Sequence, residues 1–76
     1  MELKLYTKTV CPKCILVKSV LVAAGIEYEE INIDTNDEVR QFLIDKGIMA
    51  APVLFYNDKY LTSVPEINKV ISEVAE

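Results

Sequence analysis

Residues 3–14 read LKLYTKTVCPKC and predict a strand, a loop and the start of a helix. Apolar and polar residues alternate over 3–6, which is typical of a strand with one buried face. A loop over 7–10 then leads to Pro12, which suits a first helical turn because the N–H that proline lacks is not needed there. We therefore expect a strand, a short loop and a helix in direct succession.

The stretch 15–24, ILVKSVLVAA, continues this helix, although its β-branched residues would also favour a strand. It is about ten residues long, and Gly25 follows where a glycine commonly ends a helix in a left-handed conformation. The segment is apolar on nearly every side. We therefore expect the helix to pack between the sheet and other elements.

The middle of the chain predicts a second strand and a second helix. Alternating residues over 27–33 indicate the strand. Residues 35–38, TNDE, match a capping box, in which Thr35 accepts a hydrogen bond from the backbone of Glu38 and the carboxylate reaches back. The helix that follows is expected to end at Gly47.

The last third of the chain predicts a hairpin and a final helix. Residues 53–56 and 59–61 are the expected antiparallel strands, joined by a turn at Asn57 and Asp58. Ser63 and Glu66 form a second capping-box pattern, and apolar residues at helical spacing follow it.

The element order is therefore βαβαββα within a single domain, residues 1–76. The first two strands are joined by a helix, so they should be parallel with a right-handed crossover. The expected fold class is α/β, with helices on both faces of a four-stranded mixed sheet.

Composition argues against several classes of partner. The 76 residues include twelve acidic and eight basic ones, so the formal net charge is −4, and the basic residues form no run. This charge distribution does not suit nucleic acid or an anionic membrane. No apolar stretch is long enough to span a bilayer, and the first residues lack signal-peptide character. We expect a cytoplasmic protein and a monomer.

The two cysteines, Cys11 and Cys14, are spaced as Cys-x-x-Cys. A bridge between them would close a four-residue loop, which removes little entropy from the unfolded chain. Stabilisation is therefore a poor explanation for the pair. A Cys-x-x-Cys between a strand and a helix is instead typical of redox chemistry.

The predicted helix start gives the two thiols different roles. Cys11 should lie where unpaired backbone N–H groups and the positive end of the helix dipole favour a thiolate, so we assign it as the attacking thiol. Cys14, one turn further on and expected to be more buried, is assigned as the resolving thiol. Pro12 should rigidify the turn, and the charge of Lys13 should favour the thiolate further.

Two other interpretations of the pair remain open. The cysteines could belong to a metal or iron–sulfur carrier, although the chain has no histidine and no further cysteine to complete a four-ligand site. They could also be inert and buried, although Pro12 and Lys13 suit a core strand poorly. We expect no bound metal or other cofactor beyond the redox-active disulfide itself.

Three features resemble the glutaredoxin-like branch of the thioredoxin superfamily: residues 6–14, the stretch 50–53 (AAPV) and the βαβαββα order. The resemblance implies a thioredoxin-like sheet with strand order 2-1-3-4 and a dithiol–disulfide oxidoreductase that reduces protein disulfides. It also implies a cis peptide bond between Ala51 and Pro52, beside the cysteines. There the backbone of Ala51 would pair with an incoming substrate like a short strand.

The resemblance also implies positions for glutathione. Lys8 matches a basic residue that helps bind a glutathione carboxylate. Thr62 and Ser63 stand where glutaredoxins typically have two glycines, and Pro65 removes a backbone N–H close to the start of the last helix. Glutathione is therefore expected to bind weakly. Either glutathione or a reductase would supply electrons, and protein disulfides would be the usual substrates.

The remaining polar and aromatic residues are interpreted structurally. The acidic residues Glu27, Glu29, Glu30 and Asp34 are expected to form a solvated face. Most aromatic side chains are expected to serve packing.

Overall fold

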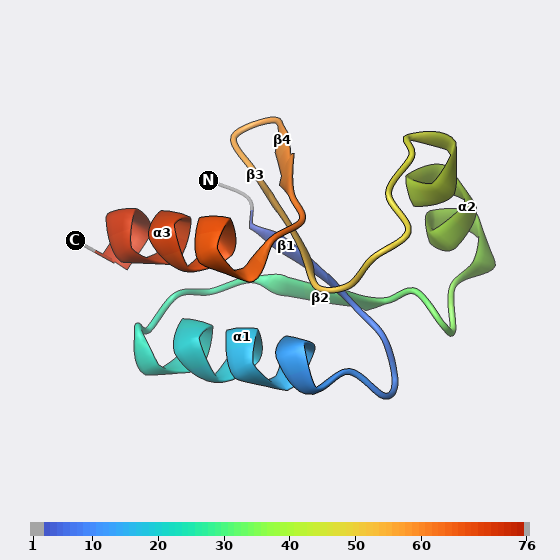
Figure 1. Ribbon diagram of the computed structural model, residues 1–76. Coiled ribbons are helices and arrows are strands. Elements are labelled where there is room, and N and C mark those ends of the chain that lie inside the picture. Colours follow the sequence, from blue (N-terminus) through green and yellow to red (C-terminus); the bar gives the residue numbers. More distant parts are fainter. Residues whose placement is uncertain (1–2, 76) are drawn as a thin grey trace.

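The computed structural model describes residues 3–75, which contain all the expected helices and strands in the expected order (Figure 1). They are β1 (Lys4–Thr7), α1 (Pro12–Ala23), β2 (Glu29–Asn32), α2 (Asp37–Asp45), β3 (Val53–Tyr56), β4 (Lys59–Leu61) and α3 (Val64–Ala75).

The four strands form one mixed sheet in the order β2-β1-β3-β4, which confirms the expected topology. Strand β1 is parallel to β2 and antiparallel to β3, and β3 is antiparallel to β4. At the centre, Leu5 lies opposite Glu30 on one side and Leu54 on the other. The loop that leaves the central strand β1 leads to Cys11, directly before α1.

Alternation along the strands produces two apolar clusters, one on each face of the sheet. Leu5 and Leu54 point to one face, where buried residues of α1 and α3 cover them. Tyr6 and Val53 point to the other face and pack with Leu43 of α2. Figure 1 shows α1 and α3 next to each other, with α2 apart from both. Helices therefore cover both faces, as expected.

The helix ends follow their local signals, with one correction. Pro12 occupies the first turn of α1, and Gly25 and Gly47 have φ of 70° and 80° after α1 and α2. The N-cap of α2 is Asn36, whose side chain accepts from the backbone N–H of Val39 at 3.1 Å. The capping box predicted at Thr35 is therefore wrong by one residue. Asparagine is as good an N-cap as threonine, so the pattern alone does not fix the register.

The hairpin and the start of α3 agree with expectation more closely. Asn57 and Asp58 have φ of 54° and 62°, the left-handed values that two-residue hairpin turns need. Ser63 Oγ accepts from the backbone N–H of Glu66 at 3.3 Å. The Glu66 carboxylate accepts from the same Ser63 hydroxyl at 3.0 Å, so this carboxylate bonds to the side chain of Ser63.

The expectation that α1 is covered on nearly every side is wrong. The helix buries Cys14, Val17 and Leu21 against the sheet and α3, while Ile15 and Val22 are exposed. Within residues 3–75, three helices over a four-stranded sheet leave no element to cover the outer side of α1.

Candidate redox site

Cys11 lies at the end of the loop that follows β1 and is the N-cap of α1. Its backbone is extended, and its Sγ accepts a hydrogen bond from the backbone N–H of Cys14 at 3.1 Å. The sulfur therefore occupies the position where a helix start stabilises negative charge. A thiolate formed here on reduction would gain the same hydrogen bond with a full charge on the acceptor.

The two cysteines are joined by a disulfide, with their Cα atoms 5.2 Å apart. Cys14 is buried, with 1% of its surface exposed, whereas Cys11 is partly exposed. A disulfide with one accessible and one buried sulfur can be approached from solvent at the accessible sulfur only. The greater burial of Cys14 agrees with the expectation from the sequence.

The loop between β1 and Cys11 is held by side chains at the end of β2. The Asp34 carboxylate accepts from the backbone N–H of Thr9 at 2.9 Å, and the Asn32 amide donates to Thr9 Oγ1 at 3.3 Å. The backbone N–H of Asp34 in turn donates to Asn32 Oδ1 at 2.8 Å. These bonds fix the backbone two residues before the accessible cysteine.

Glu30 makes a second connection to the same region. Its Oε2 accepts from the hydroxyl of buried Thr7 at 3.0 Å and from the ammonium of Lys18 at 3.2 Å. The end of β1, strand β2 and helix α1 are thereby joined at one carboxylate. Glu30 and Asp34 are exposed, as predicted for a solvated face, and both also hold hydrogen-bond partners 12 to 25 residues away along the chain.

A groove beside the helix start brings most of the predicted substrate positions together. It has a volume of about 510 Å³, and its lining includes Lys13, Ala51, Pro52, Thr62 and Ser63. Pro52 is buried and Ala51 is partly exposed, and the peptide bond between them is cis. Lys13 thus lines one groove with residues that lie 38 to 50 positions further along the chain, next to the turn that carries the cysteines.

Lys8 is not among the residues that line this groove. It lines a smaller cavity of about 170 Å³ together with Arg40, Met49 and apolar residues of α2 and the loop after it. Arg40 is already paired with Asp37 at 2.7 Å. The structure therefore places Lys8 in a different cavity from Thr62 and Ser63. Its neighbours in that cavity include Arg40 and Met49, and no motif in the sequence pointed to either residue.

Within residues 3–75, no three histidine, cysteine, aspartate or glutamate side chains gather closely enough to hold a metal ion. None of the helices described in that range is long and apolar enough to cross a membrane. The redox-active group of the site is the cysteine pair itself.

Comparison with known proteins connects this geometry to a family. A sequence model of the glutaredoxin family matches residues 3–61. The glutaredoxin-like protein NrdH of Lactococcus lactis subsp. lactis (strain IL1403) is 40% identical over 53 residues, which are 70% of this chain and 74% of that protein. Glutaredoxin 3 of Escherichia coli (strain K12) is 30% identical over 61 residues, or 79% of this chain and 74% of that protein.

Solved structures agree with this result. The glutaredoxin-like protein NrdH-redoxin from Escherichia coli superposes with a TM-score of 0.82 at 26% identity, covering 92% of this chain and 95% of that one. Glutaredoxin 1 from Francisella tularensis superposes with a TM-score of 0.77 at 21% identity, covering 96% and 94%. The second comparison concerns the fold alone.

Proposed function

Because the chain belongs to the glutaredoxin family, we propose that Cys11 is the attacking thiol and Cys14 the resolving thiol of its reaction. The chain is a dithiol–disulfide oxidoreductase, and the family implies protein disulfide substrates and a reductant. The observation that carries the assignment of roles is the difference in exposure between the two sulfurs, combined with the N–H that Cys11 Sγ accepts.

The reaction has two exchange steps. In the reduced protein the Cys11 thiolate attacks one sulfur of a substrate disulfide, which forms a mixed disulfide and releases the other substrate sulfur as a thiolate. The Cys14 thiolate then attacks Cys11 Sγ, which closes the Cys11–Cys14 disulfide and releases the second substrate sulfur. Two electrons pass to the substrate, whose thiolates take up protons. The disulfide in the structure corresponds to the end of this cycle.

Protein disulfides are proposed as the usual substrates, with glutathione bound weakly. In the groove, the Ser63 hydroxyl is already hydrogen-bonded to the backbone and carboxylate of Glu66. Pro65 has no N–H to offer an anion at the start of α3. The backbone of Ala51 would pair with an extended substrate segment, while Lys13, Thr62 and Ser63 would contact its side chains.

The NrdH-redoxin from Escherichia coli supports this proposal, because that glutaredoxin-like protein is described as having a thioredoxin-like activity profile. We propose correspondingly that a protein reductase regenerates the dithiol more readily than glutathione does. We further propose that residues 1–76 form one domain that acts as a monomer in the cytoplasm.

Insulin reduction by the purified protein tests the roles of the cysteines. Cys11→Ser should abolish turnover, whereas Cys14→Ser should accumulate a mixed disulfide on Cys11, detected as an added mass that dithiothreitol removes. A mixed disulfide on Cys14 in Cys11→Ser, with retained turnover, would reverse the assignment.

The substrate and reductant proposals need a parallel measurement. Turnover with glutathione disulfide should remain unsaturated at concentrations where insulin reduction is already saturated. NADPH with thioredoxin reductase should regenerate the dithiol faster than glutathione with glutathione reductase. Saturation by glutathione disulfide at low concentration would contradict the weak binding of glutathione.

A further inference from the structure

The groove beside the cysteines carries charge of one sign only. Among the described residues 3–75, Lys13 is the one charged residue that lines it. The other lining residues are apolar, apart from the hydroxyl residues Thr62 and Ser63, and they include Leu16, which is 62% exposed. The groove is therefore positive, although the whole chain has a net charge of −4.

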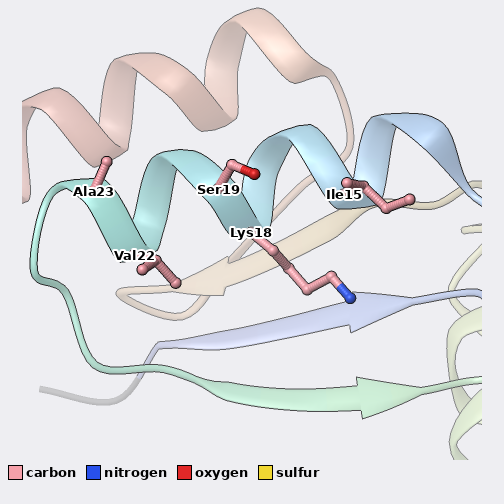
Figure 2. Close-up of a pocket in the computed structure, with 5 residues that line it drawn as sticks. All are labelled: Ile15, Lys18, Ser19, Val22 and Ala23. Atoms are coloured by element: carbon pink, nitrogen blue, oxygen red, sulfur yellow. The ribbon is translucent and has the colours of Figure 1, made fainter.

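The ammonium of Lys13 is available to a ligand. Lys13 is exposed and makes no ion pair with any residue of the range 3–75. The other lysine of α1 is different, because Lys18 lines a separate hollow along the helix (Figure 2) and its ammonium donates to Glu30 at 3.2 Å. Of the two charges on α1, that of Lys13 is the one left to attract a carboxylate from outside the chain.

The acidic residue that follows the wall of the groove does not neutralise this charge. Glu66 comes directly after Pro65, and its carboxylate accepts from the Ser63 hydroxyl at 3.0 Å. Within the described part of the chain, it forms no ion pair with Lys13. A carboxylate that a substrate brings into the groove therefore meets an unpaired ammonium.

Lys13 also lies close to the point where a substrate disulfide is attacked. Two steps of about 3.8 Å along the chain separate it from Cys11, so their Cα atoms are at most about 7.6 Å apart. An extended segment that pairs with the backbone of Ala51 advances about 3.3 Å per residue. An acidic residue within about three residues of the attacked cysteine can therefore reach the ammonium of Lys13.

We propose that Lys13 is a specificity-determining residue, and that the groove selects protein disulfides whose attacked cysteine has an aspartate or glutamate within about three residues. The proposal deepens the function proposed above and rests on it, because it needs an extended protein segment in the groove. The two exchange steps are unchanged, and the ion pair favours binding of the segment that undergoes them.

Two peptides with an intramolecular disulfide provide the test. They are identical except at the positions two residues before and after each cysteine, which are glutamate in one peptide and lysine in the other. Each kcat/KM is divided by the rate constant of the same peptide with dithiothreitol, which corrects for the effect of the charges on the disulfide itself. The wild-type protein should then prefer the glutamate peptide by about fivefold or more, because Lys13 attracts one peptide and repels the other.

Two charge reversals provide matched variants. Lys13→Glu should reverse the preference, so that the lysine peptide becomes the better substrate. Any change that this substitution makes in the reactivity of Cys11 affects both peptides and cancels in the ratio. Lys8→Glu makes the same change of charge in the other cavity, so it should change the ratio by less than about twofold. In 1 M salt, where the screening length is about 3 Å, the wild-type preference should approach one.

Three outcomes would overturn the proposal. The first is a wild-type protein without the preference, or a preference that Lys13→Glu leaves unchanged. The second is an equal loss of preference in Lys8→Glu, which would assign the effect to the general field around Cys11. The third is glutathione disulfide that saturates below the glutamate peptide and loses more in Lys13→Glu, which would assign Lys13 to glutathione.

A failure of the proposed function would look different from a failure of this proposal. Neither peptide nor insulin would then be reduced, whereas Cys11-dependent reduction of 2-hydroxyethyl disulfide would persist. If only the selection by Lys13 is wrong, both peptides are reduced, with equal ratios in the wild type and in Lys13→Glu.

Discussion

The residue that holds the loop in front of Cys11 is Asp34, at the end of β2. Its carboxylate accepts from the backbone N–H of Thr9, two residues before the accessible cysteine. A charged acceptor makes a stronger hydrogen bond than a neutral one. The position of the Cys11 sulfur therefore depends on a carboxylate that lies far from it in sequence.

Replacement of Asp34 tests this dependence. Asp34→Ala removes the acceptor, so the Thr9 amide should exchange its hydrogen about tenfold faster, which is the loss of roughly 1.4 kcal/mol of protection. Asp34→Asn keeps an acceptor oxygen and should change the rate much less. Hydrogen exchange followed by NMR gives both values. Equal Thr9 exchange in the wild type and Asp34→Ala would show that the bond does not hold the loop.

Tyr6 shows how burial affects a single titrating group. Burial raises the pKa of Tyr6 above its ordinary value of 10.0, and the neighbouring Tyr60 and Glu29 raise this pKa further. The folded protein therefore resists ionisation of this tyrosine more than the unfolded chain does. The stability that protonated Tyr6 provides is fully present below pH 10 and is lost as the pH rises through the higher pKa of the folded state.

Tyr6→Phe should consequently reduce the loss of stability in alkaline solution. Between pH 9 and pH 11, the free energy of unfolding should fall less steeply for this variant than for the wild type, whose unfolded state releases the Tyr6 proton more readily. Urea unfolding at a series of pH values measures both slopes. Identical slopes would mean that Tyr6 ionises equally easily in both states.

At the scale of elements, α2 begins one residue later than its capping pattern suggested. Asn36 is its N-cap and accepts from Val39, whereas the Thr35 hydroxyl donates to the carbonyl of Asn32 at 3.2 Å. Threonine and asparagine both suit the N-cap position. In the structure Asn36 occupies it, with an extended backbone.

Alanine substitution distinguishes the two residues. Asn36→Ala should lower the free energy of unfolding by about 1 kcal/mol, because it leaves a backbone N–H of the first turn without its partner. Thr35→Ala, the matched control, should cost about 0.5 kcal/mol or less. Chemical denaturation of the two variants measures the difference, and a larger loss for Thr35→Ala would restore the original capping box.

At the scale of the whole molecule, the two faces of α1 have opposite roles although both are apolar. Leu21 is fully buried in the cluster between the sheet, α1 and α3, whereas Leu16 is 62% exposed and lines the groove beside the cysteines. In a chain of 76 residues, a core this small makes each buried side chain a large fraction of the total stability.

The same substitution on the two faces should therefore have very different effects. Leu21→Ala should lower the free energy of unfolding by about 2 to 5 kcal/mol, through lost burial and the cavity that remains. Leu16→Ala should change it by about 0.5 kcal/mol or less. Thermal and urea unfolding compare the two. Similar losses for both variants would mean that Leu16 is covered in solution.

The sequence by itself was sufficient for the order of the elements and the cysteine pair, whereas the strand order of the sheet was implied by the resemblance to glutaredoxins. The element order and the cysteine pair depend on local patterns: alternation within a strand, helical spacing, glycine at Gly25 and Gly47, and the position of Cys11 beside Pro12. Such patterns span about four residues, because they reflect backbone hydrogen bonds and side-chain direction within one element.

Only the tertiary structure decided which distant residues meet. It brought Thr62 and Ser63 to the same groove as Lys13, placed Lys8 in another cavity, and joined Asp34 to the loop before Cys11. It also left the outer side of α1 exposed. An apolar helix face looks the same in sequence whether it is covered or not, because its burial depends on which other elements pack against it.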